Sequence, residues 1–123
     1  MACSVLAWYM LDSTCGNNLL TEVWSPDGKY KVVVFQRDCG ATTGFSTQLS
    51  LMPSQHQLGN ESGNIFVADT NHGAAPSGIG GGPSVSIQWL DPESLVVIHH
   101  PNARISMAEP QSSGVRIMYK TAE

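Results

Sequence analysis

A four-residue turn between two apolar-rich runs constrains this chain more than any other feature. The turn is Ser25-Pro26-Asp27-Gly28, in which Pro presets φ at the second position, Asp suits the third and Gly is permissive at the fourth. The flanking runs, 19–24 and 30–35, have the composition of strands. The segment therefore predicts an antiparallel hairpin.

Two cysteines share the register expected of this hairpin. If Trp24 pairs with Tyr30 and the ladder continues without interruption, Cys15 pairs with Cys39. Their sulfur atoms then lie within bridging distance, provided that the strands extend that far. We expect a Cys15–Cys39 disulfide, which is typical of an oxidising compartment.

The same register places apolar side chains on both faces of the hairpin. Leu19 faces Phe35 on one side, and Leu20 faces Val34 on the other. Because both faces are apolar, we expect the hairpin to be central and covered on both sides. The apolar segment 4–11 is a candidate for one of the two covers.

Short apolar runs separated by Gly- and Pro-rich turns continue to the end of the chain, and they lie at 45–51, 64–68, 85–89, 95–99, 104–107 and 115–119. Strands at this spacing without a long helix are typical of a sandwich or barrel. We expect residues 1–123 to form one all-β domain. It should be an antiparallel β-sandwich or flattened barrel of about 7–8 short strands. The glycine-dense segment 69–84 is expected to be a mobile surface loop.

The charge balance narrows the range of partners. The chain has six Lys plus Arg, no basic stripe and a formal net charge of −4, so we expect no nucleic-acid binding. The apolar segment after Cys3 is too short to span a bilayer, so membrane association is at most peripheral. Three interpretations of residues 1–13 stay open: a short helix packed on the core, the remnant of a targeting segment, or a lipid-attachment site at Cys3.

No motif of a metal, cofactor or catalytic site is complete. His99 and His100 are adjacent on an expected strand and point to opposite faces, and His56 and His72 lack zinc-ligand spacing. The oxygen-rich run 69–73 departs from a calcium loop. No Gly-x-Ser-x-Gly sequence frames a serine, and the run 80–82 lacks the residues of a phosphate loop. We expect no metal and no cofactor.

Several segments together resemble a family of small uncharacterised bacterial proteins. The residues that carry the resemblance are Cys15-Gly16-Asn17, Ser25-Pro26-Asp27-Gly28-Lys29-Tyr30-Lys31 and the run from Arg37 to Gln48 (RDCGATTGFSTQ). The similarity continues through 64–69 to the Trp89 hairpin. Members of this family usually begin with an export signal, so the resemblance implies an exported domain, in the periplasm or otherwise outside the cytoplasm.

Polar residues near the expected disulfide and in the glycine-dense segment form a candidate recognition surface, which comprises Arg37, Asp38, Thr42, Thr43, Ser46, Asp69 and His72. Loops on a rigid β-scaffold are where recognition usually occurs. The leading hypothesis is an exported, non-enzymatic module that binds a protein or an envelope component. The alternatives are a small-ligand carrier and an enzyme with a site assembled from scattered residues.

Overall fold

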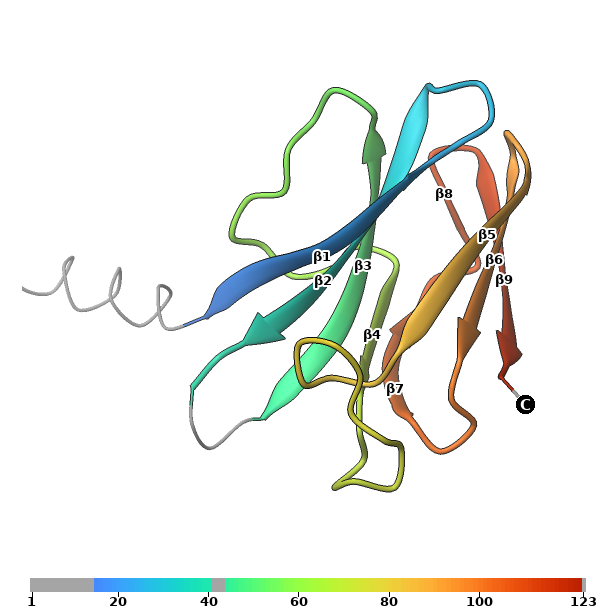
Figure 1. Ribbon diagram of the computed structural model, residues 1–123. Coiled ribbons are helices and arrows are strands. Elements are labelled where there is room, and N and C mark those ends of the chain that lie inside the picture. The colour runs from blue at the N-terminus through green and yellow to red at the C-terminus, as the bar shows by residue number, and fades with distance from the viewer. Residues whose placement is uncertain (1–14, 41–43, 123) are drawn as a thin grey trace, which may run out of the picture.

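Nine strands form two facing sheets in the computed structural model, which describes residues 15–40 and 44–122 (Figure 1). One sheet has the order β1-β2-β3-β4-β7, and the other has the order β5-β6-β9-β8. Their bounds are β1 (Gly16–Trp24), β2 (Tyr30–Asp38), β3 (Phe45–Pro53), β4 (Phe66–Asp69), β5 (Val85–Asp91), β6 (Ser94–His99), β7 (Arg104–Ala108), β8 (Gln111–Ser112) and β9 (Val115–Thr121). The all-β sandwich is confirmed, and the sheets do not close into a barrel.

Two details of the topology differ from the expectation. The two-residue strand β8 lies in the segment that was expected to be a turn. In addition, β6 and β9 are parallel, whereas every other strand pair is antiparallel. The chain leaves β6 to add β7 to the opposite sheet and then returns, so β9 runs beside β6 in the same direction.

The first hairpin has the predicted turn, but the register that we predicted for the residues next to the turn is wrong by one residue. The N–H of Gly28 donates to the carbonyl of Ser25 (2.9 Å), as in a turn closed by its fourth residue. Ser25 itself pairs with Tyr30, because its N–H donates to the Tyr30 carbonyl (2.9 Å). Trp24 is therefore opposite Lys31.

A bulge restores the predicted register further along the hairpin. The pairing shifts between Leu19 and Thr21, where Leu20 is the extra residue. Beyond the bulge, Leu19 pairs with Phe35 as predicted. The predicted disulfide between Cys15 and Cys39 is present, with the two Cα atoms 3.8 Å apart.

Strand β2 is buried on both of its faces. Val32 and Val34 belong to the main core between the sheets, whereas Val33 and Phe35 form a second cluster with Met52. Leu58, in the loop between β3 and β4, packs against this second cluster. The double cover is thus confirmed, and this loop supplies the outer cover. The segment 4–11 and Cys3 lie outside the described residues.

Two aromatic side chains link the sheets along opposite edges of the sandwich. On one edge, the indole N–H of Trp89 donates to the Val23 carbonyl (3.2 Å). On the other, the Tyr119 hydroxyl lies 2.6 Å from the Glu109 carbonyl and 3.3 Å from that of Ile65. Burial, and secondarily the charge of Glu109, raises the pKa of Tyr119 to about 12.

We predict that removing the disulfide with the double substitution Cys15→Ser and Cys39→Ser lowers the free energy of unfolding by about 3 kcal/mol. The cysteines are separated by 24 positions. A cross-link that closes a loop of this size lowers the conformational entropy of the unfolded chain, which stabilises the fold by about 3 kcal/mol. Urea unfolding with and without reductant checks this. Reductant should destabilise the wild type and leave the double variant unchanged; equal midpoints for all four samples would contradict the prediction.

Candidate functional site

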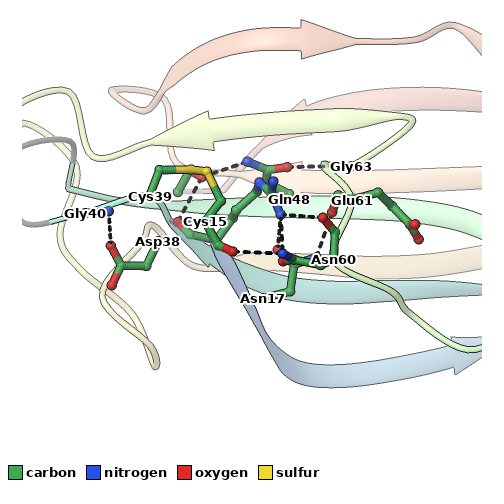
Figure 2. The surroundings of a disulfide bond; sticks show 11 residues. Cys15, Asn17, Asp38, Cys39, Gly40, Gln48, Asn60, Glu61 and Gly63 are labelled. Atoms are coloured by element: carbon green, nitrogen blue, oxygen red, sulfur yellow. Dashed lines mark hydrogen bonds between the residues drawn. A yellow bond between two sulfur atoms is a disulfide. The ribbon is translucent and has the colours of Figure 1, made fainter. Parts of the chain in front are cut away.

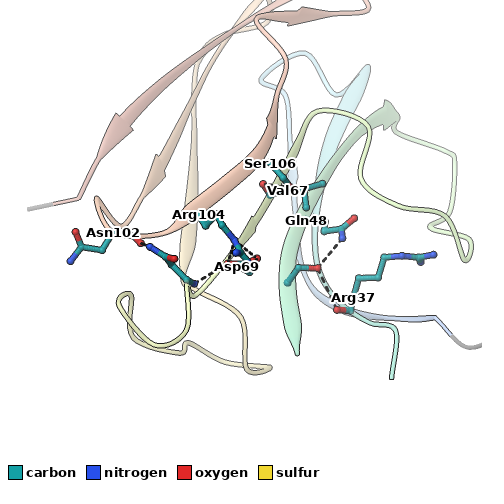
Figure 3. A network of polar contacts seen from close by, with 9 residues as sticks. Arg37, Gln48, Val67, Asp69, Asn102, Arg104 and Ser106 are labelled. Atoms are coloured by element: carbon teal, nitrogen blue, oxygen red, sulfur yellow. Dashed lines mark hydrogen bonds and ion pairs between the residues drawn. The ribbon is translucent and has the colours of Figure 1, made fainter. Parts of the chain in front are cut away.

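Three of the residues expected from sequence to mediate recognition are direct neighbours across the sheet. Arg37 pairs with Ser46, and Ser46 pairs with Asp69. Asp69 pairs in turn with Arg104, at the start of β7. Because directly paired residues share a face, these four residues, which we name the polar row, cross β2, β3, β4 and β7 on one face. Figure 3 shows Arg37, Asp69 and Arg104 of this row.

The Asp69 carboxylate is held by a two-pronged contact with Arg104 (Figure 3). Nε of Arg104 lies 3.1 and 3.0 Å from the two carboxylate oxygens, and Nη2 lies 2.8 Å from Oδ2. The Asn71 N–H donates to Oδ1 as well (2.8 Å). Partial burial acts to raise the pKa of Asp69, but these hydrogen bonds outweigh it and the pKa is lowered. Asp69 is therefore a fixed, ionised acceptor.

Arg37 and Asp38 have structural contacts at the disulfide end of the hairpin. Nη1 of Arg37 donates to Oδ1 of Asn17 (2.8 Å), and Oδ1 of Asp38 accepts the Gly40 N–H (3.0 Å). The Asn60 amide donates to the Cys15 carbonyl (2.9 Å), as Figure 2 shows. These contacts anchor the loop between β3 and β4 to the bridged strand ends.

The glycine-rich segment packs closely against the end of the sandwich. The Thr47 hydroxyl donates to the Pro83 carbonyl (2.6 Å), and both residues are buried. A Cβ at Gly82 would lie 2.5 Å from Oγ1 of Thr47, and a Cβ at Gly81 would overlap the Phe45 ring. The glycines at 80–82 thus permit close approach of backbone to sheet. Of the segment that was expected to be a mobile surface loop, residues 71–74 are exposed, whereas Gly82 and Pro83 are buried against the sheet.

A cleft of about 390 Å³ opens where this segment meets the ends of β3, β4 and β7. We name it the rim cleft; its side chains are Phe45, Asp69, Thr70, His72, Ser77 and Arg104. Its volume is in the range of small-molecule sites, about 300–1,000 Å³. Apart from the Asp69–Arg104 pair, the polar side chains of the cleft make no hydrogen bond to the described part of the chain. Their hydrogen-bonding groups are available to a ligand.

His72 enters the cleft from a turn with an uncommon backbone conformation. Asn71 and His72 have φ values of 55° and 57°, in the left-handed region that non-glycine residues rarely adopt. The Asn71 amide donates to the Asn102 carbonyl (3.3 Å), and that of Asn102 donates to the Ala74 carbonyl (3.4 Å). These contacts hold the turn against the loop between β6 and β7.

The sequence identified part of this site. Asp69 and His72 line the rim cleft, and Ser46 lies beside Asp69 in the polar row. Thr42 and Thr43 lie outside the described residues. Arg104 and Phe45 were not among the expected site residues: Phe45 was assigned to a strand face, and Arg104 was regarded as the start of a strand. A charged residue at a strand end was the available signal for Arg104.

The other histidine and metal candidates do not gather into a site. His99 is buried, and its ring stacks on Phe66 with centroids 5.9 Å apart. His56 lines a separate recess under the loop between β3 and β4. Within residues 15–40 and 44–122, no group of three or more His, Cys, Asp or Glu side chains is arranged to hold a metal ion.

Comparison with models of known protein families, with curated protein sequences and with solved structures gave no match to this chain. Among the residues that the structure describes, no helix is long and apolar enough to cross a membrane.

We predict that Asp69→Asn lowers stability at neutral pH by about 0.5 kcal/mol, the size of an exposed ion pair. Because folding lowers the pKa of Asp69, its contribution is present above about pH 4 and is lost as the pH falls through the folded pKa. Wild type and variant should therefore converge in acid-titrated urea unfolding. Asp91→Asn is the control, because it removes a carboxylate while the side-chain oxygen can still accept the Glu93 N–H (2.7 Å in the wild type). A wild-type-to-Asp69→Asn difference that is constant at all pH values would contradict the prediction.

We predict that Gly82→Ala destabilises the fold by about 1–3 kcal/mol, because the added methyl group overlaps Thr47. Gly16→Ala is the matched control, since a Cβ there meets nothing within 4 Å. Thermal unfolding of the two variants measures the difference. Equal melting temperatures would mean that the segment does not pack tightly against β3 in solution.

Proposed function

We propose that this protein is an exported, non-enzymatic β-domain that acts outside the cytoplasm by binding a protein or an envelope component. The Cys15–Cys39 disulfide carries the choice of compartment, because such bonds persist in oxidising surroundings. Its integration in the fold supports a structural role: the Cys15 carbonyl accepts the Asn60 amide, and Asn60 belongs to the outer cover of β2.

The rim cleft supports action by contact. It brings together Thr70, His72 and Ser77, whose side chains make no hydrogen bond to the described residues, at an end of the sandwich. The His72 and Ser77 side chains are exposed, so their hydrogen-bonding groups can be reached by an external partner.

An enzyme is the second candidate, because Asp69 and His72 line the same cleft. The Arg104 contact disfavours Asp69 as a general base, since the lowered pKa of its carboxyl reduces its basicity. A carrier has less support: the apolar recess beside Leu20, Val34 and Pro83 has a volume of about 220 Å³, below the usual range of ligand sites.

The experiment that tests the proposal has two arms in the cell of origin. In the first, maleimide labelling of the unreduced, denatured protein should leave Cys15 and Cys39 unmodified, and fractionation should recover the protein outside the cytoplasm. In the second, a photo-crosslinking residue at His72 should capture an envelope component that one at Leu90, exposed in β5, does not.

Two results would overturn the proposal. One is a reduced, cytoplasmic protein. The other is turnover in a broad hydrolase screen that His72→Ala or Asp69→Ala abolishes while the fold stays intact, which would establish the enzyme instead.

A further inference from the structure

The rim cleft is close to electrically neutral. Its carboxylate, Asp69, is neutralised by the guanidinium of Arg104 at 2.8 Å. The chain as a whole carries a formal net charge of −4, which repels anionic ligands at long range. The net charge disfavours an anion, and the Arg104 pairing leaves Asp69 without an uncompensated charge to attract a cation, so a polar but uncharged ligand fits this cleft best.

The hydrogen-bonding groups of the cleft suit hydroxyl groups. The Asp69 carboxylate accepts hydrogen bonds, the Thr70 and Ser77 hydroxyls both donate and accept, and the His72 ring offers two nitrogen atoms. Since a hydroxyl group is also both donor and acceptor, a ligand carrying several hydroxyls can satisfy this mixed set.

One wall of the cleft is aromatic. The Phe45 side chain is 44% exposed, and Gly81 lies directly against its ring. Gly81 has a φ of 103°, so a side chain there would be strained as well as overlapping the ring. The result is a small apolar surface beside polar groups, which matches a ring with C–H bonds on its face and hydroxyls at its edge.

From this combination we infer that the rim cleft binds a neutral saccharide unit, an inference that rests on the proposed binding function. The C–H face of the sugar ring packs on Phe45, and its hydroxyls bond to Asp69, His72 and Ser77. A volume of about 390 Å³ accommodates a small saccharide. The same chemistry is offered by a free sugar and by a unit of a surface polysaccharide.

The test is an amide NMR titration of the complete chain with a panel of neutral mono- and disaccharides, followed by an array of neutral polysaccharides. We expect shifts at Thr70, His72 and Ser77. Phe45→Ala should weaken binding roughly tenfold, because it removes the aromatic surface. Asp69→Asn should weaken binding as well. Leu90→Ala and Asp91→Asn, which change an exposed apolar and an acidic residue of β5 outside the cleft, should leave it unchanged.

Each outcome decides between the two levels of the proposal. Binding by free saccharides, or by polysaccharides alone, supports the inference and identifies the source of the sugar. If no saccharide binds while the His72 crosslinker still captures an envelope protein, the inference is wrong and the proposed function stands. Neutral peptides that shift the same amides in place of sugars would also overturn it. Failure of both sugars and crosslinking would overturn both.

Discussion

Burial of β2 on both faces is the constraint on which the rest of the structure depends. Val32 and Val34 face the second sheet, and Val33 and Phe35 would face solvent without the loop between β3 and β4. That loop contributes one apolar side chain, Leu58, to the outer cluster, so polar contacts help to hold it in place. Asn64 makes two of these contacts. Its side-chain amide accepts the Leu51 N–H (2.8 Å) and donates to the Leu51 carbonyl (3.0 Å), as the backbone of a neighbouring strand would.

The disulfide is the second attachment of this cover, and it is possible only because of the bulge. An uninterrupted ladder from the Ser25–Tyr30 pair would place Cys15 opposite Gly40, and the extra residue Leu20 moves it opposite Cys39. The bridged end then presents the Cys15 carbonyl to Asn60. The bulge in β1 thus sets the register that allows the disulfide to form, and the bridged end in turn anchors the loop that covers β2.

The strands were predictable because their signals are local: alternating apolar residues and the Pro-Asp-Gly turn. The sandwich followed from their number and spacing. The register of the hairpin was only half predictable, since no residue near Leu20 signals a bulge and two one-residue displacements cancelled at the cysteines. The polar row was even harder to predict from the sequence. Its neighbours Asp69 and Arg104 lie 35 positions apart, and their pairing depends on which strand β7 joins. The glycines at 80–82 suggested a mobile backbone, whereas in the structure Gly81 and Gly82 allow the backbone to approach Phe45 and Thr47 closely.

The left-handed turn at Asn71 and His72 forms one side of the rim cleft. Left-handed non-glycine residues cost about 1 kcal/mol each and persist where the surroundings impose them. Here the imposing contacts are the Asn71 N–H on Asp69 and the Asn71 amide on the Asn102 carbonyl. The same Asp69 carboxylate is held by Arg104, so one set of bonds positions both the acceptor of the cleft and the backbone of the turn that carries His72. A carboxylate held in this way loses little conformational freedom when a ligand binds, which reduces the entropic cost of association. Asn and His are among the non-glycine residues that adopt the left-handed region most often, so the sequence of the turn accommodates its backbone. With the backbone in this conformation, His72 lines the rim cleft beside Asp69, the carboxylate that holds the turn in place.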